Sequence, residues 1–104
     1  MAVVVAFSTF PSAEVAAEVA RALVGEQLAA CVNLVPNVRS IYRWQGAIED
    51  ATETLAVIKT TEDRLAAMQA RLVALHPYDV PEVIALPIAG GHAAYLAWVT
   101  DATR

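Results

Sequence analysis

The sequence predicts a single α+β domain over residues 1–104, built as an antiparallel sheet with helices on one face. Short β-branched and apolar runs alternate with longer stretches in which apolar residues recur every three to four positions. These are the patterns of strands and of amphipathic helices. The segments follow the order β-α-β-β-α-β with one further helix, and a chain of 104 residues fits one domain.

The first strand and the first helix are both well marked. Val3–Thr9 is a β-branched run of strand length and predicts a buried strand. Pro11 and Ser12 then open a helix that should end between Gly25 and Leu28, with Gly25 as the candidate stop. Its apolar stripe has helical spacing and consists of Val15, Val19, Ala22 and Leu23.

The middle of the chain predicts a long hairpin. Ala30–Val35 is strand-like, and Pro36-Asn37 interrupts it in a way that suits a bulge or a sheet edge. Val38–Trp44 resumes the strand, Gln45-Gly46 forms a turn, and Ala47–Thr60 returns. The arms are too long to be covered by so small a domain, so their edges must be paired or blunted.

A second helix follows the hairpin. Thr60 or Thr61 should cap it, and His76-Pro77 should end it, because the residue before a proline avoids the helical conformation. Its buried stripe is predicted to be Leu65, Met68, Leu72 and Leu75.

The last elements are a strand at Val83–Ile88, a turn at Gly90-Gly91 and a terminal helix at Ala93–Thr103. The full order is that of the ferredoxin-like split βαβ pattern, an antiparallel sheet with a long central hairpin.

Composition narrows the possible partners. Hydrophobic residues make up 58% of the chain and charged residues 17%, so a subunit interface is expected to take up the surplus apolar surface. The net charge of −4, with seven scattered Lys and Arg residues, argues against nucleic acid. A lone cysteine, Cys31, with no basic leader and no apolar run of roughly 18 residues, predicts a cytoplasmic location without membrane contact.

The sequence lacks the residues that other functional classes with this fold require. The loop after the first strand has no Cys-x-x-Cys for Cu(I), and no arginine for an acylphosphatase-like anion cradle. The strand Leu55–Lys59 lacks the aromatic residues of an RNA-recognition sheet. No nucleophile or acid–base set is recognisable, so an enzyme is not expected. Cys31 could meet His76 in space, but a buried, inert thiol is the simpler interpretation.

The densest polar cluster covers residues 76–82. His76, Asp79 and Glu82 are possible ligands for Zn or Cu(II), and two prolines would stiffen the segment. Alternatively, His76 caps the preceding helix while Asp79 and Glu82 fix the turn. His92 is expected to be an exposed loop residue.

Two weaker features remain. Lys59 precedes the expected helix N-terminus and could help to bind an anion, although capping alone explains the threonines after it. Tyr42, Arg43 and Trp44 lie near the hairpin tip and are predicted to form an interface rather than to stack on a ligand.

Taken in order, these motifs resemble the CutA divalent-cation-tolerance family along essentially the whole chain. The resemblance rests on Leu28-Ala29-Ala30-Cys31-Val32-Asn33, Ile41-Tyr42-Arg43-Trp44 with Gly46, Ile58-Lys59-Thr60-Thr61, residues 76–82 and Tyr95-Leu96-Ala97-Trp98-Val99. It implies a homotrimer in which long hairpins pair with neighbouring subunits, similar in architecture to PII signalling proteins. The residues that it implies for a cleft between subunits are Cys31, Trp44, Lys59, His76, Tyr78 and Glu82.

Two functional hypotheses follow from this resemblance. The first is a trimeric cytoplasmic protein that binds a divalent metal such as copper and contributes to the response to metal ions. The second is a PII-like sensor that binds a small anionic ligand near Lys59. Gln27, Gln45 and Ala47 stand where relatives often carry basic residues, so this chain offers less positive charge to an anion.

Overall fold

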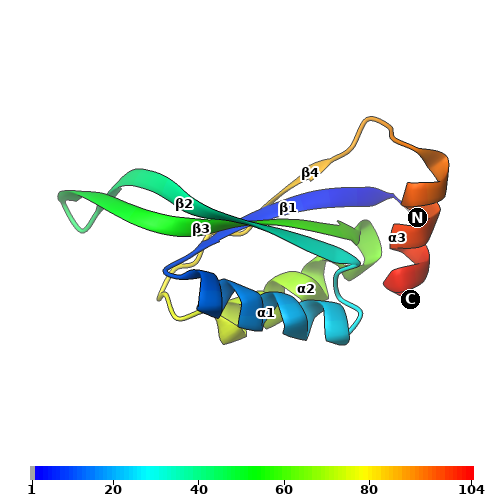
Figure 1. Ribbon diagram of the computed structural model, residues 1–104, viewed down its shortest axis with the longest axis horizontal. Coiled ribbons are helices and arrows are strands. Elements are labelled where there is room, and N and C mark those ends of the chain that lie inside the picture. The colour runs from blue at the N-terminus through cyan, green and yellow to red at the C-terminus, as the bar shows by residue number, and fades with distance from the viewer. Residues whose placement is uncertain (1) are drawn as a thin grey trace.

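The computed structural model describes residues 2–104. It contains β1 (Val3–Phe10), α1 (Ala13–Gly25), β2 (Cys31–Trp44), β3 (Ala47–Thr61), α2 (Glu62–Leu75), β4 (Ile84–Pro87) and α3 (Ala93–Ala102). The strands form one antiparallel sheet in the order β2-β3-β1-β4. Helices α1 and α2 cover one face, and α3 lies at one end of the sheet (Figure 1). The predicted ferredoxin-like order is confirmed.

The core lies between the sheet and these two helices. Side chains of β1 alternate between the two faces, so that every second residue points toward the helices. The predicted stripes supply the helix side of the core: Val19 and Leu23 from α1, and Met68 and Leu72 from α2, are all at most 4% exposed. Leu65 and Leu75 are half-buried at its margin.

The helix ends differ from the prediction in detail. Ser12 caps α1, accepting a hydrogen bond of 3.2 Å from the backbone N–H of Val15. The helix ends at Gly25, but the residue with left-handed backbone is Gln27, at φ 60°. Thr61 occupies the cap position of α2 without a side-chain hydrogen bond. The Thr60 hydroxyl donates instead to the carbonyl of Leu28 at 2.7 Å.

The hairpin extends far beyond the rest of the sheet. β1 pairs with β3 only over residues 54–61 of β3, whereas β2 pairs with β3 along the whole hairpin. The register shifts between Val35 and Val38, where Asn37 adopts φ 62°, so the predicted bulge is confirmed. Gln45 and Gly46, at φ 49° and 83°, form the tight turn.

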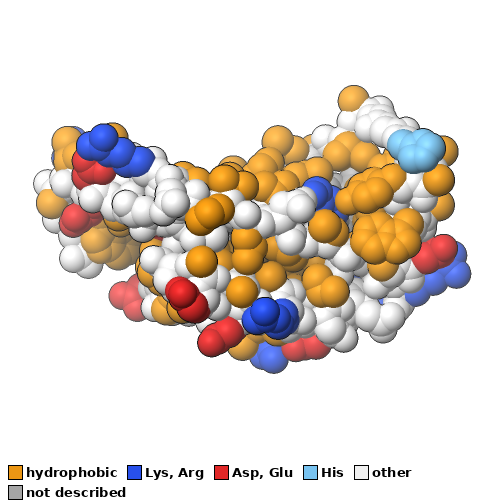
Figure 2. Space-filling model, viewed as in Figure 1, with side chains coloured by type: hydrophobic (Ala, Val, Ile, Leu, Met, Phe, Trp, Pro, Cys, Tyr) orange, Lys and Arg blue, Asp and Glu red, His pale blue; other side chains and the backbone are white. Residues whose placement is uncertain are grey.

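The second face of the sheet carries apolar side chains, and within residues 2–104 no helix lies over its middle (Figure 1). Paired residues in a register share a face, which places Phe7 beside Val57 and Ile84, and Val5 beside Leu86. Ile84 and Leu86 are each 57% exposed. Figure 2 shows hydrophobic side chains gathered in the hollow between the hairpin and α3. This open sheet face is the apolar surface that the composition predicts.

α3 covers only one end of the molecule. Val99 packs with Val3 and Ala30 in a second, smaller cluster. Within residues 2–104, no helix is both long and apolar enough to cross a bilayer.

Candidate functional site

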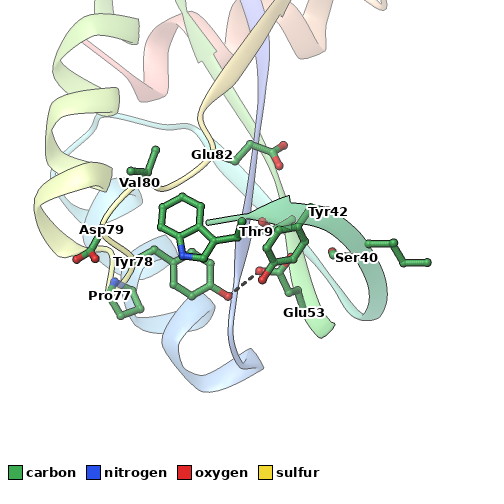
Figure 3. A pocket seen from close by; sticks show the side chains of 11 residues that line it. Thr9, Ser40, Tyr42, Glu53, Pro77, Tyr78, Asp79, Val80 and Glu82 are labelled. Atoms are coloured by element: carbon green, nitrogen blue, oxygen red, sulfur yellow. Dashed lines mark hydrogen bonds between the residues drawn. The ribbon is translucent and has the colours of Figure 1, made fainter. Parts of the chain in front are cut away.

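A pocket of about 670 Å³ lies where the hairpin runs past the end of β1 (Figure 3). The loop between α2 and β4 forms its other wall. The residues that line it are Thr9, Ser40, Ile41, Tyr42, Trp44, Glu53, Pro77, Tyr78, Asp79, Val80 and Glu82. Its size falls within the range of small-molecule sites.

Local backbone geometry decides which hairpin residues reach this pocket. Beyond the bulge, Val38 pairs with Glu53, and the even-numbered residues of β2 share the face of Glu53. Tyr42 and Trp44 therefore point to the same side. Arg43 alternates to the opposite face, so Tyr42 and Trp44 are directed to one side of the hairpin and Arg43 to the other.

Glu53 and Tyr78 form the central contact of the pocket. The Tyr78 hydroxyl donates to Glu53 Oε2 at 2.6 Å (Figure 3). Glu53 itself is buried, with 6% of its surface exposed. Burial raises the pKa of Tyr78 above its ordinary value, and the hydrogen bond to Glu53 and that residue's negative charge raise it further. Tyr78 is therefore a neutral donor that satisfies one oxygen of a buried carboxylate.

His76 lies behind the pocket and has a structural role. One ring nitrogen, Nε2, lies 2.7 Å from the carbonyl oxygen of Thr9, and Nδ1 accepts the backbone N–H of Tyr78 at 3.1 Å. Because a carbonyl only accepts, the proton resides on Nε2. The ring stacks on Phe10 with a centroid distance of 4.5 Å, and the backbone N–H of His76 bonds to Leu72 at the end of α2.

The predicted metal ligands are not assembled as one set. Both ring nitrogens of His76 are engaged, and Asp79 and Glu82 lie on different sides of the pocket (Figure 3). Across residues 2–104, no group of three or more His, Cys, Asp and Glu side chains is placed to hold a metal ion. The two carboxylates remain exposed to solvent.

Cys31 and Lys59 belong to a different place. They are register partners on the open sheet face, where Lys59 Nζ donates to Asn33 Oδ1. Cys31 is half-buried rather than buried, and its Sγ lies 3.9 Å from the same oxygen. Tyr95 of α3 is close by, and its pKa is raised by burial first and by Cys31 second.

The six predicted ligand residues thus divide between two locations in the chain. Trp44, Tyr78 and Glu82 line the pocket with His76 behind them, while Cys31 and Lys59 lie on the open sheet face. Sequence reasoning missed Glu53. No local pattern links it to Tyr78, which lies 25 residues further along the chain.

The charged side chains that line the pocket are all acidic. Its lining residues, all within the described part of the chain, include the carboxylates of Glu53, Asp79 and Glu82 and no lysine or arginine. On the hairpin, Arg39 pairs with Asp50 at 2.6 Å in an exposed ion pair. The pocket therefore suits a cation better than an anion.

The molecule is a ferredoxin-like domain with an overlong hairpin, an open apolar sheet face and an acidic, aromatic pocket. The model of a family described as "CutA1 divalent ion tolerance protein" matches residues 4–102. The chain belongs to this family.

Similar proteins come from distant organisms. The "Divalent-cation tolerance protein CutA" of Thermus thermophilus is 53% identical over 95 residues, covering 91% of this chain and 92% of that protein. Human "Protein CutA" is 48% identical over 99 residues, which are 95% of this chain but only 55% of the human protein.

Solved structures agree with the fold. The Thermus thermophilus protein (Cut A1) matches with a TM-score of 0.95 at 50% identity, covering 98% of this chain and 99% of that one. CutA1 from Oryza sativa matches with a TM-score of 0.97 at 44% identity, covering 100% of this chain and 95% of that one.

Proposed function

We propose that this chain is a homotrimeric divalent-cation-tolerance protein that takes up divalent cations, copper among them, at the carboxylates of its pocket. The observation that carries this proposal is the pocket itself, which presents Glu53, Asp79 and Glu82 without a lysine or arginine among its described lining residues. Family membership supplies the cellular context of divalent cations.

Asp79 and Glu82 are the preferred ligands in this proposal. Both are exposed, and no hydrogen bond or ion pair joins either to another described residue. Because they lie apart, each supplies one carboxylate, and water or a neighbouring subunit completes the coordination. Cu(II) binds a given nitrogen or oxygen donor set more strongly than the other divalent first-row metals do, so it is the most sensitive probe. His76 would have to give up a hydrogen bond to take part.

Two features support the homotrimer. The first is the hairpin, which extends past the end of β1 and leaves Ile41 and Ile48 exposed by 64% and 69%. The second is the open sheet face, which leaves Ile84 and Leu86 uncovered. Apolar surface of this kind is usually buried by association. Tyr42, Arg43 and Trp44 remain the proposed hairpin contribution, with Arg43 directed to the opposite side from the two aromatic residues.

The alternative of a PII-like sensor for an anionic ligand has less support. Lys59, the cation on which that hypothesis depends, is outside the pocket and donates to Asn33. A small anion at the pocket would face three carboxylates.

The remaining expectations are part of the same proposal. The Thermus thermophilus relative is named as a tolerance protein, and we propose a binding function without catalysis. We also propose the cytoplasm as its location, since the free thiol of Cys31 suits a reducing compartment. A similar structure, from Archaeoglobus fulgidus, is described as periplasmic, so fractionation of cells that express the chain is the direct test.

Calorimetric titration of the metal-stripped protein with Cu(II) tests the metal proposal. We expect Asp79→Asn combined with Glu82→Gln to abolish the heat of binding. His76→Gln, which keeps a polar side chain, should retain it once circular dichroism shows a folded protein. Binding that survives the carboxylate changes but disappears with His76→Gln would reverse the assignment. Absence of binding to the wild-type protein would refute it.

A further inference from the structure

The pocket has a second property that metal binding does not use, namely aromatic side chains around a buried carboxylate. Tyr42 and Trp44 approach from one face of β2, and Tyr78 approaches from the loop between α2 and β4. In the single chain Tyr42 is 43% and Trp44 41% exposed and both line the pocket, so a ligand there would lie where the hairpin contacts a neighbouring chain in the proposed trimer. Figure 3 shows the Tyr78 hydroxyl pointing toward Glu53.

Glu53 is an unusual group at the base of such a pocket. It is buried to 94% by its 6% exposure, yet it lines the cavity. Oε2 accepts the Tyr78 hydroxyl at 2.6 Å. Oε1 has no hydrogen-bond partner among the described residues, although it is not sealed from solvent as the Ser8 hydroxyl is. A buried carboxylate with one oxygen free is costly unless a partner compensates its charge.

Aromatic faces and a carboxylate attract the same kind of ligand. The face of an aromatic ring carries negative potential, and quaternary or methylated ammonium groups bind in cages of Trp and Tyr. The rings tolerate a bulky, weakly hydrated cation that a carboxylate pair alone would not select. Asp79 and Glu82 at the sides, and Glu49 opposite Tyr42 on β3, increase the negative potential.

We propose that the pocket formed by Tyr42, Trp44, Tyr78 and Glu53 binds a small organic ammonium cation. The cationic head lies against the aromatic rings near Glu53 Oε1. The volume of about 670 Å³ exceeds what a methylated ammonium head needs, so the ligand carries an organic tail that extends toward Val80. The proposal does not depend on metal binding.

Choline and its neutral isostere 3,3-dimethylbutan-1-ol distinguish charge recognition from simple apolar filling. The chain has two tryptophans, Trp44 and Trp98, so Trp98→Phe makes Trp44 the sole reporter. In this background, with chelator present, we expect choline to change Trp44 fluorescence saturably while the neutral alcohol does not. Equal responses to both compounds, or none to millimolar choline, would refute the proposal.

Variants of the pocket locate the binding. Calorimetry should show choline affinity reduced at least about tenfold by Trp44→Ala. Trp44→Phe should reduce the affinity less, because phenylalanine keeps an aromatic ring, although the negative potential on its face is weaker. Glu53→Gln should also weaken choline binding, because it removes the buried negative charge that faces the cationic head. Choline binding that Trp44→Ala leaves unchanged would place the site elsewhere and overturn the assignment. Loss of Cu(II) binding in the Asp79→Asn, Glu82→Gln protein tests the other proposal separately.

Discussion

Ser8 and His76 are polar side chains at the margin of the same core, but only the side chain of His76 forms hydrogen bonds within the described residues. Ser8 lies on the helix side of β1, is 0% exposed, and its hydroxyl is without a partner among the described residues. His76 uses both ring nitrogens and stacks on Phe10. At the scale of single residues, hydrogen-bond satisfaction decides whether a buried polar group stabilises the fold.

Ser8→Ala should therefore stabilise the protein. Removing an unsatisfied buried hydroxyl relieves a desolvation penalty of about 1 kcal/mol. Urea unfolding at fixed protein concentration measures the change in the free energy of unfolding. Ser12→Ala is the matched control, because it removes the cap of α1 and should cost about 1 kcal/mol. A loss of stability with Ser8→Ala would mean that the hydroxyl has a partner in solution.

Tyr78 makes stability dependent on alkaline pH. Its pKa is raised in the folded state, so folded Tyr78 keeps its proton where the unfolded chain loses it. The resulting stabilisation is complete below the ordinary tyrosine pKa of about 10 and declines as pH rises above it. Urea unfolding at increasing pH should show this decline, and Tyr78→Phe should reduce its slope. Equal slopes would show that Glu53 and burial do not hold the proton.

The hairpin is the element in which backbone conformation matters most. Gln45 and Gly46 both have positive φ, and this permits a two-residue turn whose twist suits the strands. The turn projects Tyr42 and Trp44 past the end of β1, where the pocket forms. The ion pair of Arg39 and Asp50 on this hairpin is exposed and contributes little.

Gly46→Ala should destabilise the hairpin by about 1 kcal/mol, because an L side chain is disfavoured at its φ of 83°. A Cβ there would meet no atom within 4 Å, so the cost is conformational rather than steric. Gly25→Ala, at the end of α1, has equally open space without positive φ and should be neutral or stabilising. Thermal unfolding of the two variants checks this difference. Equal effects would contradict the conformational explanation.

At the scale of the whole molecule, the unequal faces of the sheet are the main feature. One face is covered by α1 and α2, and the other presents Ile84 and Leu86. With extents of 44 × 26 × 21 Å, the subunit is elongated by its projecting hairpin. Both properties suit the homotrimer that we propose.

Leu86→Lys should shift the proposed trimer toward monomer, because a charge would enter the apolar contact. Light scattering coupled to size exclusion measures the mass, about three times 11.1 kDa for the trimer. Val24→Lys, on the helix side and 42% exposed, should leave the mass unchanged. A monomeric wild-type protein would refute the proposed assembly.

The pattern of the sequence was sufficient for the order of the elements. Strand and helix periodicities differ clearly, and the turn at Gln45-Gly46 and the bulge beside Pro36 have local causes. The extent of β4 was less predictable: the structure shortens Val83–Ile88 to Ile84–Pro87, because only these residues pair with β1.

What the sequence by itself determined is the fold class, the long hairpin, the surplus of apolar surface and the family, all of which depend on local pattern or on motifs in order. Only the tertiary structure decided the composition of the pocket. Tyr78 meets Glu53 across 25 residues, and His76 meets Thr9 across 67. Such contacts leave no local periodicity, because they arise where the overhang of one hairpin meets a loop from a distant part of the chain.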